Sequence, residues 1–178
     1  MRQEVQRAPG TFLPLLKLAL FTVFVPGTVT LWLPYSLYTA VFRAGMAPGG
    51  SPRRGGAVVI LAGTIGYFWC ALDFAFADRG TPAPFDPPKA LVARGLYRYV
   101  RNPMYLSVLL VLLGESLLFK SLLLLRYAAL WWFIVFLFVL FYEEPALRRK
   151  FGSSYESYCA GVPRWIPRLP RAKDGHAV

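Results

Sequence analysis

Residues 98–105 have the sequence Arg-Tyr-Val-Arg-Asn-Pro-Met-Tyr, and they join a polar, proline-rich stretch to a long apolar run. Proline is favoured at the first position of a helix, so Pro103 predicts a helix start with Asn102 as its N-cap. A helix start carries unpaired backbone N–H groups and the positive end of the helix dipole. With Arg98 and Arg101 beside it, this helix start is a predicted binding place for an anion.

The composition points to a membrane. The chain of 178 residues is 56% hydrophobic and 16% aromatic, which exceeds the apolar share of soluble domains. A net charge of +11 would suggest nucleic acid as the partner of a soluble protein. Here the basic residues flank apolar runs, so we interpret them as charge at a membrane surface and expect no nucleic-acid partner.

The chain has too few cysteines and histidines for a metal site, a disulfide framework or a histidine-based catalytic triad. Cys70 and Cys159 show neither metal-ligand spacing nor a disulfide framework. The single histidine, His176, lies in a polar tail of the kind that is usually disordered. We therefore expect no metal site and no histidine-based catalytic triad.

Four apolar stretches are long enough to cross a bilayer, which takes about twenty apolar residues. They cover residues 12–42, 56–77, 103–119 and 121–142. The first is too long for one straight span, so we expect a long, tilted helix kinked by its prolines. The alternative is a re-entrant pair broken at Pro26-Gly27, which would give five membrane segments. The prediction is an all-α integral membrane protein with about four transmembrane helices.

The polar segments connect and follow these spans. Residues 78–97 are rich in proline and predict a stiff, extended linker. Residues 103–142 predict a helical hairpin with a tight turn near Lys120. Pro145 disfavours helix at the residue before it, so the last span should kink or end there. Two short helices should follow, lying in the membrane interface or packed on the bundle, on either side of Gly152. We expect residues 1–178 to form a single membrane domain, with N-terminal spans in 12–77 and a polar tail in 169–178.

Basic residues predict the orientation. With four spans, fourteen of them lie on the side that holds both termini and the 79–101 segment, against four on the other side. The positive-inside rule then puts both termini and this segment in the cytoplasm.

A hairpin brings the start of its first helix beside the end of its second. We therefore expect cations and a helix start on one side and carboxylates on the other, which suits a zwitterionic cofactor; the residues are Arg98, Arg101, Asn102 and Tyr105, opposite Glu143 and Glu144. The alternative is that these arginines only pair with the glutamates and hold the hairpin closed. Asp73, near the end of the second span, is a further functional candidate, or an ordinary surface aspartate.

The sequence resembles the isoprenylcysteine carboxyl methyltransferase family and, more distantly, the phospholipid N-methyltransferases. The resemblance covers roughly residues 79–168. Its motifs are Gly95-x-Tyr97-Arg98-x-x-Arg101-Asn102-Pro103-x-Tyr105, Glu143-Glu144-x-x-Leu147-x-x-x-Phe151-Gly152-x-x-Tyr155-x-x-Tyr158 and Val162-Pro163-Arg164-Trp165-Ile166-Pro167.

The resemblance implies an integral-membrane methyltransferase that uses S-adenosylmethionine, with 79–168 as its cofactor-binding core. The implied acceptor is lipophilic, an isoprenoid-type carboxylate or a lipid, and enters from the bilayer. The implied cofactor-site residues are Tyr97, Arg98, Arg101, Asn102, Tyr105, Glu143 and Glu144. Among the catalytic candidates are Glu144, Arg101 and Arg164, and the candidates for substrate contact are Asp73, Arg164 and Trp165.

One position departs from the family, which commonly has histidine where this chain has Asn102. Asparagine cannot take up a proton near neutral pH, so an acceptor that is already ionised, such as a carboxylate, is favoured. Glu143, Glu144 or Asp73 could serve instead as a base. Two other hypotheses remain: an NADPH-dependent enzyme like the sterol reductases, and a non-catalytic lipid-binding protein on the same scaffold.

Overall fold

The computed structural model of the chain describes residues 12–43, 54–78 and 93–168. These residues are helical and contain no strand, which confirms the all-α prediction. The elements in chain order are α1 (Phe12–Phe24), the π-helical turn η1 (Thr28–Trp32), α2 (Leu33–Arg43), α3 (Arg54–Asp78), the 3-10 turn η2 (Gly95–Arg98), α4 (Pro103–Leu118), α5 (Leu122–Phe138), the second π-helical turn η3 (Val139–Glu143), α6 (Glu144–Phe151) and α7 (Ser153–Gly161).

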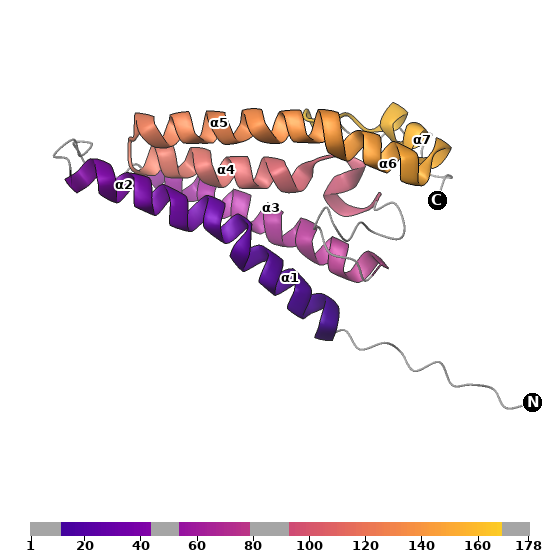
Figure 1. Ribbon diagram of the computed structural model, residues 1–178, viewed down its shortest axis with the longest axis horizontal. Helices are drawn as coiled ribbons and strands as arrows, with labels where there is room; N and C mark the ends of the chain where they lie inside the picture. Colours follow the sequence, from indigo (N-terminus) through magenta and orange to yellow (C-terminus); the bar gives the residue numbers. More distant parts are fainter. Residues whose placement is uncertain (1–11, 44–53, 79–92, 169–178) are drawn as a thin grey trace, which may run out of the picture.

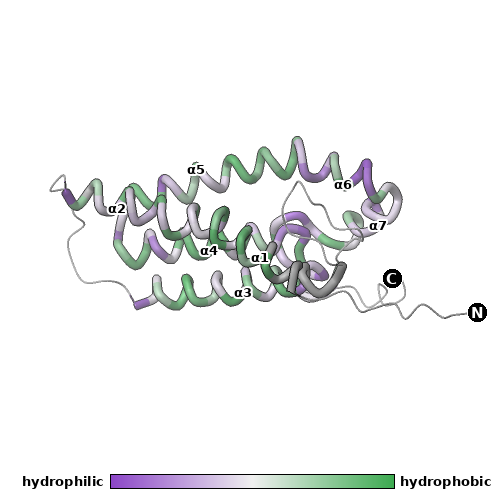
Figure 2. The backbone as a smooth tube through the Cα atoms, turned by 60° about the horizontal axis from the view of Figure 1, so that its bottom comes forward, coloured by the Kyte–Doolittle hydropathy of each residue, from purple (hydrophilic) through white to green (hydrophobic). Residues whose placement is uncertain are grey.

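The long helices form a bundle with α4 at its centre. α4 runs back along α3, and α5 returns along α4 after a turn at Phe119 and Lys120, so the predicted hairpin is present (Figure 1). The beginning of α1, the end of α3, η2 and α7 all lie at one end of the bundle (Figure 1). Figure 2 shows hydrophilic residues in and near α6 at this end.

The first membrane segment is one bent helix, as expected, and not a re-entrant pair. α1, η1 and α2 follow each other along one path, and residues Leu18–Ala40 are long and apolar enough to cross a membrane. The bend coincides with η1, where the Leu33 N–H bonds to the Thr28 carbonyl, five residues back. The next donor in this pattern would be Pro34, which has no N–H. The Val29 carbonyl instead accepts a hydrogen bond from the Tyr127 hydroxyl of α5, at 2.9 Å.

The same device occurs before Pro145. In η3 the Glu144 N–H bonds to the Val139 carbonyl, five residues back, and Pro145 follows directly. A widened turn relieves the clash between a proline ring and the carbonyl four residues earlier. The last span therefore does not end at Pro145: Leu122–Phe151 is continuous helix. The two predicted short helices are present as α6 and α7, on either side of Gly152, and α6 continues directly from the last span.

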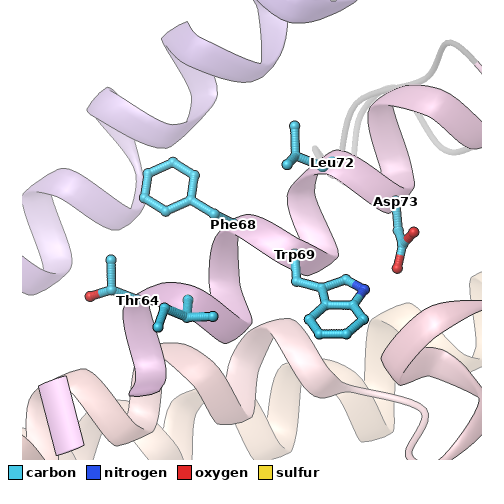
Figure 3. A pocket seen from close by; sticks show the side chains of 6 residues that line it. Thr64, Phe68, Trp69, Leu72 and Asp73 are labelled. Carbon is cyan, nitrogen blue, oxygen red and sulfur yellow. The ribbon is translucent and has the colours of Figure 1, made fainter. Parts of the chain in front are cut away.

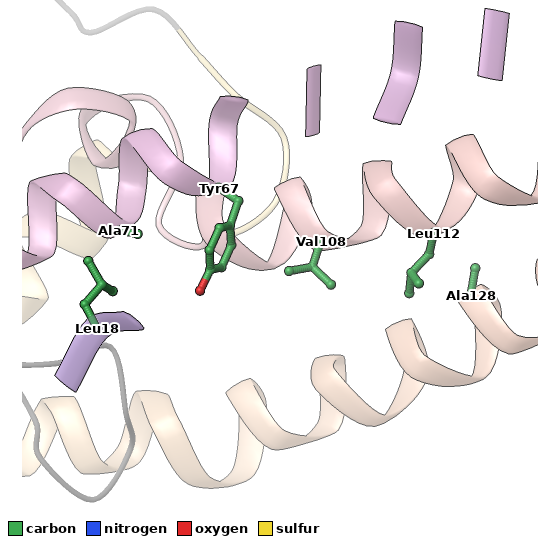
Figure 4. Packing of buried hydrophobic residues seen from close by; sticks show 6 residues of the cluster. All are labelled: Leu18, Tyr67, Ala71, Val108, Leu112 and Ala128. Atoms are coloured by element: carbon green, nitrogen blue, oxygen red, sulfur yellow. The ribbon is translucent and has the colours of Figure 1, made fainter. Parts of the chain in front are cut away.

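The core joins all the membrane segments. Leu18 of α1, Tyr67 and Ala71 of α3, Val108 and Leu112 of α4, and Ala128 of α5 form one buried cluster (Figure 4). Outside this core the bundle is apolar, as lipid contact requires. In the described part of the chain, three segments are long and apolar enough to span a membrane: Leu18–Ala40, Arg54–Asp73 and Leu122–Phe151. α4 is shorter, at 16 residues, and is the most buried helix.

α3 and α4 pack with their backbones in close approach. A Cβ atom on Gly63 would lie 2.6 Å from the Ser107 carbonyl oxygen and 2.9 Å from the Val111 nitrogen. Small residues allow membrane helices to approach this closely. Gly63 is therefore one of the residues that allow α3 and α4 to pack closely, together with Gly56 and Gly114.

We predict that Gly63→Ala lowers the free energy of unfolding by about 1–3 kcal/mol, because the methyl group meets backbone atoms that cannot move aside. The measurement is denaturant titration of the protein in micelles, followed by circular dichroism. Gly55→Ala on the same helix is the matched control, since nothing lies within 4 Å of a Cβ there. Equal effects of the two substitutions would contradict the close approach.

Candidate functional site

Residues 93–102 lead into α4 and begin the polar end of the bundle. Tyr97 of η2 is buried against Cys70 of α3. Pro103 is the first residue of α4 and Asn102 is its N-cap, as the sequence predicts. The Asn102 side chain does not cap the helix, however. Its Nδ2 donates to the Arg164 carbonyl, at 3.2 Å, so Asn102 ties the helix start to the C-terminal segment.

Residues 162–168 form a strap that lies along residues 99–102. The Arg101 N–H donates to the Pro163 carbonyl at 2.9 Å, and the Arg168 N–H donates to the Tyr99 carbonyl at 3.1 Å. These two backbone bonds and the Asn102 amide hold the strap beside the start of α4. The strap thereby brings Arg164 and Trp165 to the end of α5.

A cluster of three charged groups lies between the strap, α4 and α6. Arg164 binds Glu144 through two parallel bonds, Nε to Oε1 and a terminal nitrogen to Oε2, both 2.7 Å. Arg101 donates from a terminal nitrogen to the same Oε1, at 3.0 Å. The Glu144 side chain is only 6% exposed. Its hydrogen bonds raise the pKa of Arg164 above the ordinary value.

Glu143 has a different environment from its neighbour. Its Oε2 accepts a hydrogen bond from the Tyr105 hydroxyl of α4, at 2.9 Å. No guanidinium or ammonium group in the described part of the chain forms an ion pair with it. Tyr97 lies nearby: burial first, and then the charges of Cys70 and Glu143, raise the pKa of this phenol well above its ordinary value.

Among the residues that the structure describes, two buried N–H donors at this site find no hydrogen-bond partner: Nε of Arg101 and Nε1 of Trp165. The Trp165 ring packs edge-on against Trp132 of α5, with ring centres 4.5 Å apart, and stacks at 6.1 Å on Phe136. A buried donor without an acceptor costs about 1–3 kcal/mol. The two donors therefore favour a bound group that carries acceptor oxygens, such as a carboxylate.

Asp73 lies apart from this cluster. Arg94 donates to the Asp73 carbonyl at 2.8 Å, and its Nε is 3.7 Å from Oδ1. The other carboxylate oxygen, Oδ2, is buried against Gly95, whose φ of +55° and close contact leave no room for a side chain. Asp73 thus fixes the start of η2.

Asp73 also ends a pocket of about 550 Å³ on the membrane-facing side of α3. The other lining residues are mostly apolar and exposed: Thr64, Ile65, Phe68, Trp69 and Leu72. Figure 3 shows Trp69 and Asp73 on one side of α3 and Phe68 on the other. The pocket joins a surface suited to hydrocarbon with a polar end near η2.

The structure thus brings Arg101, Asn102, Glu144 and Arg164 into direct contact, and pairs Tyr105 with Glu143. It does not join Arg98 to either glutamate: its side chain is exposed at the end of η2. Sequence reasoning missed three contact residues: Arg94, Tyr158 and Cys159. Arg94 donates to the Asp73 carbonyl, the Tyr158 hydroxyl donates to the Tyr97 carbonyl, and Cys159 Sγ accepts a hydrogen bond from Arg101. Arg94 directly precedes the Gly95 motif, and Tyr158 belongs to the glutamate motif, so spacing offered a signal for both.

Comparison with known proteins gives two matches. Residues 53–154 match the phospholipid methyltransferase family. Over 82 residues the chain is 39% identical to a Protein-S-isoprenylcysteine O-methyltransferase of Schizosaccharomyces pombe, a match that covers 45% of this chain and 34% of that protein. The chain therefore matches about a third of the length of this relative. No solved structure gives a significant match.

We predict that Glu144→Ala lowers the free energy of unfolding by about 3–5 kcal/mol, because it leaves Arg101 and Arg164 without the carboxylate that pairs them. Glu156→Ala is the control: its ion pair with Arg148 is exposed on both sides, so the expected loss is under about 1 kcal/mol. Both values come from denaturant titration in micelles. A Glu144→Ala protein as stable as the control would mean that the cluster does not stabilise the fold.

Proposed function

The chain belongs to the phospholipid methyltransferase family, and from that premise we propose that it transfers the methyl group of S-adenosylmethionine to a lipophilic acceptor at the membrane surface. The observation that carries the proposal is the pair of buried, unpartnered donors beside the Arg101–Glu144–Arg164 cluster. Such donors suit the carboxylate of an amino-acid moiety.

The residues present fit the other parts of this cosubstrate as well. Glu143 is a carboxylate without a cationic partner among the described residues, so it suits an ammonium or a sugar hydroxyl. When bound, S-adenosylmethionine supplies a methyl group on a positively charged sulfur. The chain's own contribution is to place this group beside the acceptor and to exclude water, since methyl transfer depends largely on positioning.

Glu144 supports this site indirectly. Three hydrogen bonds from two guanidinium groups occupy its oxygens, which leaves little capacity for a ligand. Its proposed role is to orient Arg101 and Arg164, and through Arg164 the strap. Asn102, bonded to the Arg164 carbonyl, has a role in the same assembly, and this role does not need a titratable side chain.

The acceptor is proposed to reach the site from the bilayer. The α3 pocket is lined mainly by apolar side chains that face lipid, and its polar end lies at Asp73, beside the start of η2. η2 carries Tyr97, and the charge of Glu143 is one of the causes, after burial, that raise the pKa of this phenol. A prenyl or acyl chain in the pocket would thus have its polar end on the same side of the membrane as the charged cluster. The relative from Schizosaccharomyces pombe is named for a prenylated acceptor, which agrees with this route.

We expect the intact protein in micelles to bind S-adenosylhomocysteine, the product of the proposed cosubstrate, in calorimetry. Trp165→Phe removes one N–H and keeps a ring, so it should weaken binding about tenfold or more. Trp32→Phe is the control, because Trp32 is exposed on the first helix. An intact protein that binds NADPH and not S-adenosylhomocysteine would refute the proposal and favour a reductase.

The charged end is proposed to be cytoplasmic, because most basic residues of the described part of the chain lie in residues 93–101, α6 and the strap, which are at that end. The test uses two exposed positions at opposite ends of the bundle, Ser153→Cys and Lys120→Cys, each in a Cys159→Ser background. In intact cells a membrane-impermeant maleimide should label the cysteine at 120 and reach the one at 153 only after lysis. The reverse labelling pattern would invert the orientation.

A further inference from the structure

The strap, residues 162–168, follows α7 at the polar end of the bundle and runs back along α5 (Figure 1). Its Trp165 ring lies 4.5 Å from the ring of Trp132 and 6.1 Å from the ring of Phe136, measured between ring centres. Arg164, the residue before it, binds Glu144 of α6. Within two neighbouring residues the strap thus passes from the charged cluster to the apolar side chains of α5.

The last long helix gives the depth of this contact in the membrane. Residues 122–142 are apolar or aromatic apart from one arginine. At 1.5 Å per residue they measure about 30 Å, which is the thickness of the hydrocarbon core of a bilayer. The two glutamates follow directly, so the hydrocarbon ends close to Tyr142. Phe136 lies roughly 9 Å inside that boundary, and Trp165, which packs on it, is therefore at the level of the acyl chains.

The backbone of the strap suits this depth, where no water is available to bond N–H and carbonyl groups. Pro163 and Pro167 have no N–H, so two donors are absent from the start. The Pro163 carbonyl accepts a bond from the Arg101 N–H at 2.9 Å, and the Arg164 carbonyl accepts one from the Asn102 amide at 3.2 Å. Irregular backbone is tolerated at membrane depth where protein groups satisfy it in this way.

Ile166 follows Trp165 and is the most exposed large apolar side chain of the described residues, at 76%. Phe133 and Phe141 of the last long helix, which are 59% and 72% exposed, lie on either side of Phe136 along the chain. Exposed side chains of this kind face lipid in a membrane-spanning helix. An exposed isoleucine at the same level therefore has acyl chains as its surroundings.

We propose that the strap is inserted into the membrane leaflet that holds the charged cluster, with Ile166 among the acyl chains. Contact with lipid then holds Trp165 against α5 and, through the chain, Arg164 against Glu144. Acyl chains are the occupant that the depth of the contact with α5 favours. Water and a second protein chain are the other possible surroundings of Ile166, and the test distinguishes all three.

The first measurement identifies what surrounds residue 166 in the full chain, reconstituted in phosphatidylcholine nanodiscs. A bimane fluorophore is attached to Ile166→Cys in a Cys159→Ser background; Cys70 is buried and should not react. Nitroxides on the lipid acyl chains and iodide in the water then quench it in separate samples. Ser153→Cys, exposed on α7, is the matched control. The ratio of acyl-chain quenching to iodide quenching should be at least about threefold higher at 166 than at 153.

The second measurement follows the strap itself by limited proteolysis in the same nanodiscs. Trypsin can cut after Arg164 only when the strap leaves its place, because Arg164 is bonded to Glu144. Ile166→Asp should raise the rate of this cut about tenfold or more, since an aspartate among acyl chains favours the displaced strap. Ile166→Leu is the control and should leave the rate unchanged.

Three results would overturn the insertion of the strap. They are a quenching ratio at 166 no higher than at 153, protection of residue 166 from both quenchers by another protein chain, and equal cleavage of Ile166→Asp and Ile166→Leu. Neither measurement uses S-adenosylmethionine, so failure of the protein to bind that cosubstrate would leave both results as they stand.

Discussion

The bonding of Glu144 to Arg101 and Arg164 is the interaction on which the polar end of this protein depends. A buried carboxylate is costly unless it is paired and hydrogen-bonded, and here three bonds from two chain segments satisfy it. Arg101 comes from the start of α4 and Arg164 from the strap, so a single side chain of α6 joins three parts of the fold. The strap is then oriented by two backbone bonds and by Asn102.

The position of the Glu144 carboxylate depends on the π-helical turn that precedes Pro145. Pro34 and Pro145 each follow a π-helical turn, and in each case the helix continues because the turn is widened. In the first helix the Val29 carbonyl, which Pro34 leaves without an N–H donor, accepts a hydrogen bond from the Tyr127 hydroxyl. This bond attaches the bent part of the first helix to α5. In the last helix the same device brings two adjacent glutamates to different partners, Glu143 to a phenol and Glu144 to two guanidinium groups.

This separation gives the two glutamates different chemistry, although they are neighbours in sequence. Glu144 is fixed and fully bonded, whereas Glu143 retains capacity to bind a ligand. The apolar pocket on α3 ends at Asp73, which contacts Gly95 at the start of η2, and the polar cluster includes Arg101, which follows the end of η2. On the proposed function, a lipophilic molecule in the pocket and a charged cosubstrate at the cluster would therefore approach each other near η2.

The sequence by itself determined the helical class, four apolar segments, the bent first helix, the hairpin and the helix start at Pro103, because apolar length, proline and turn residues act locally. It also brought Arg101 and Tyr105 toward Glu143 and Glu144, since a hairpin closes that distance. Only the tertiary structure decided which glutamate each partner takes, that Arg98 stays outside, and that Asn102 binds the strap instead of capping its helix. These choices depend on side-chain rotation around η3 and on contacts sixty residues apart, such as Asn102 with Arg164, which no local pattern encodes.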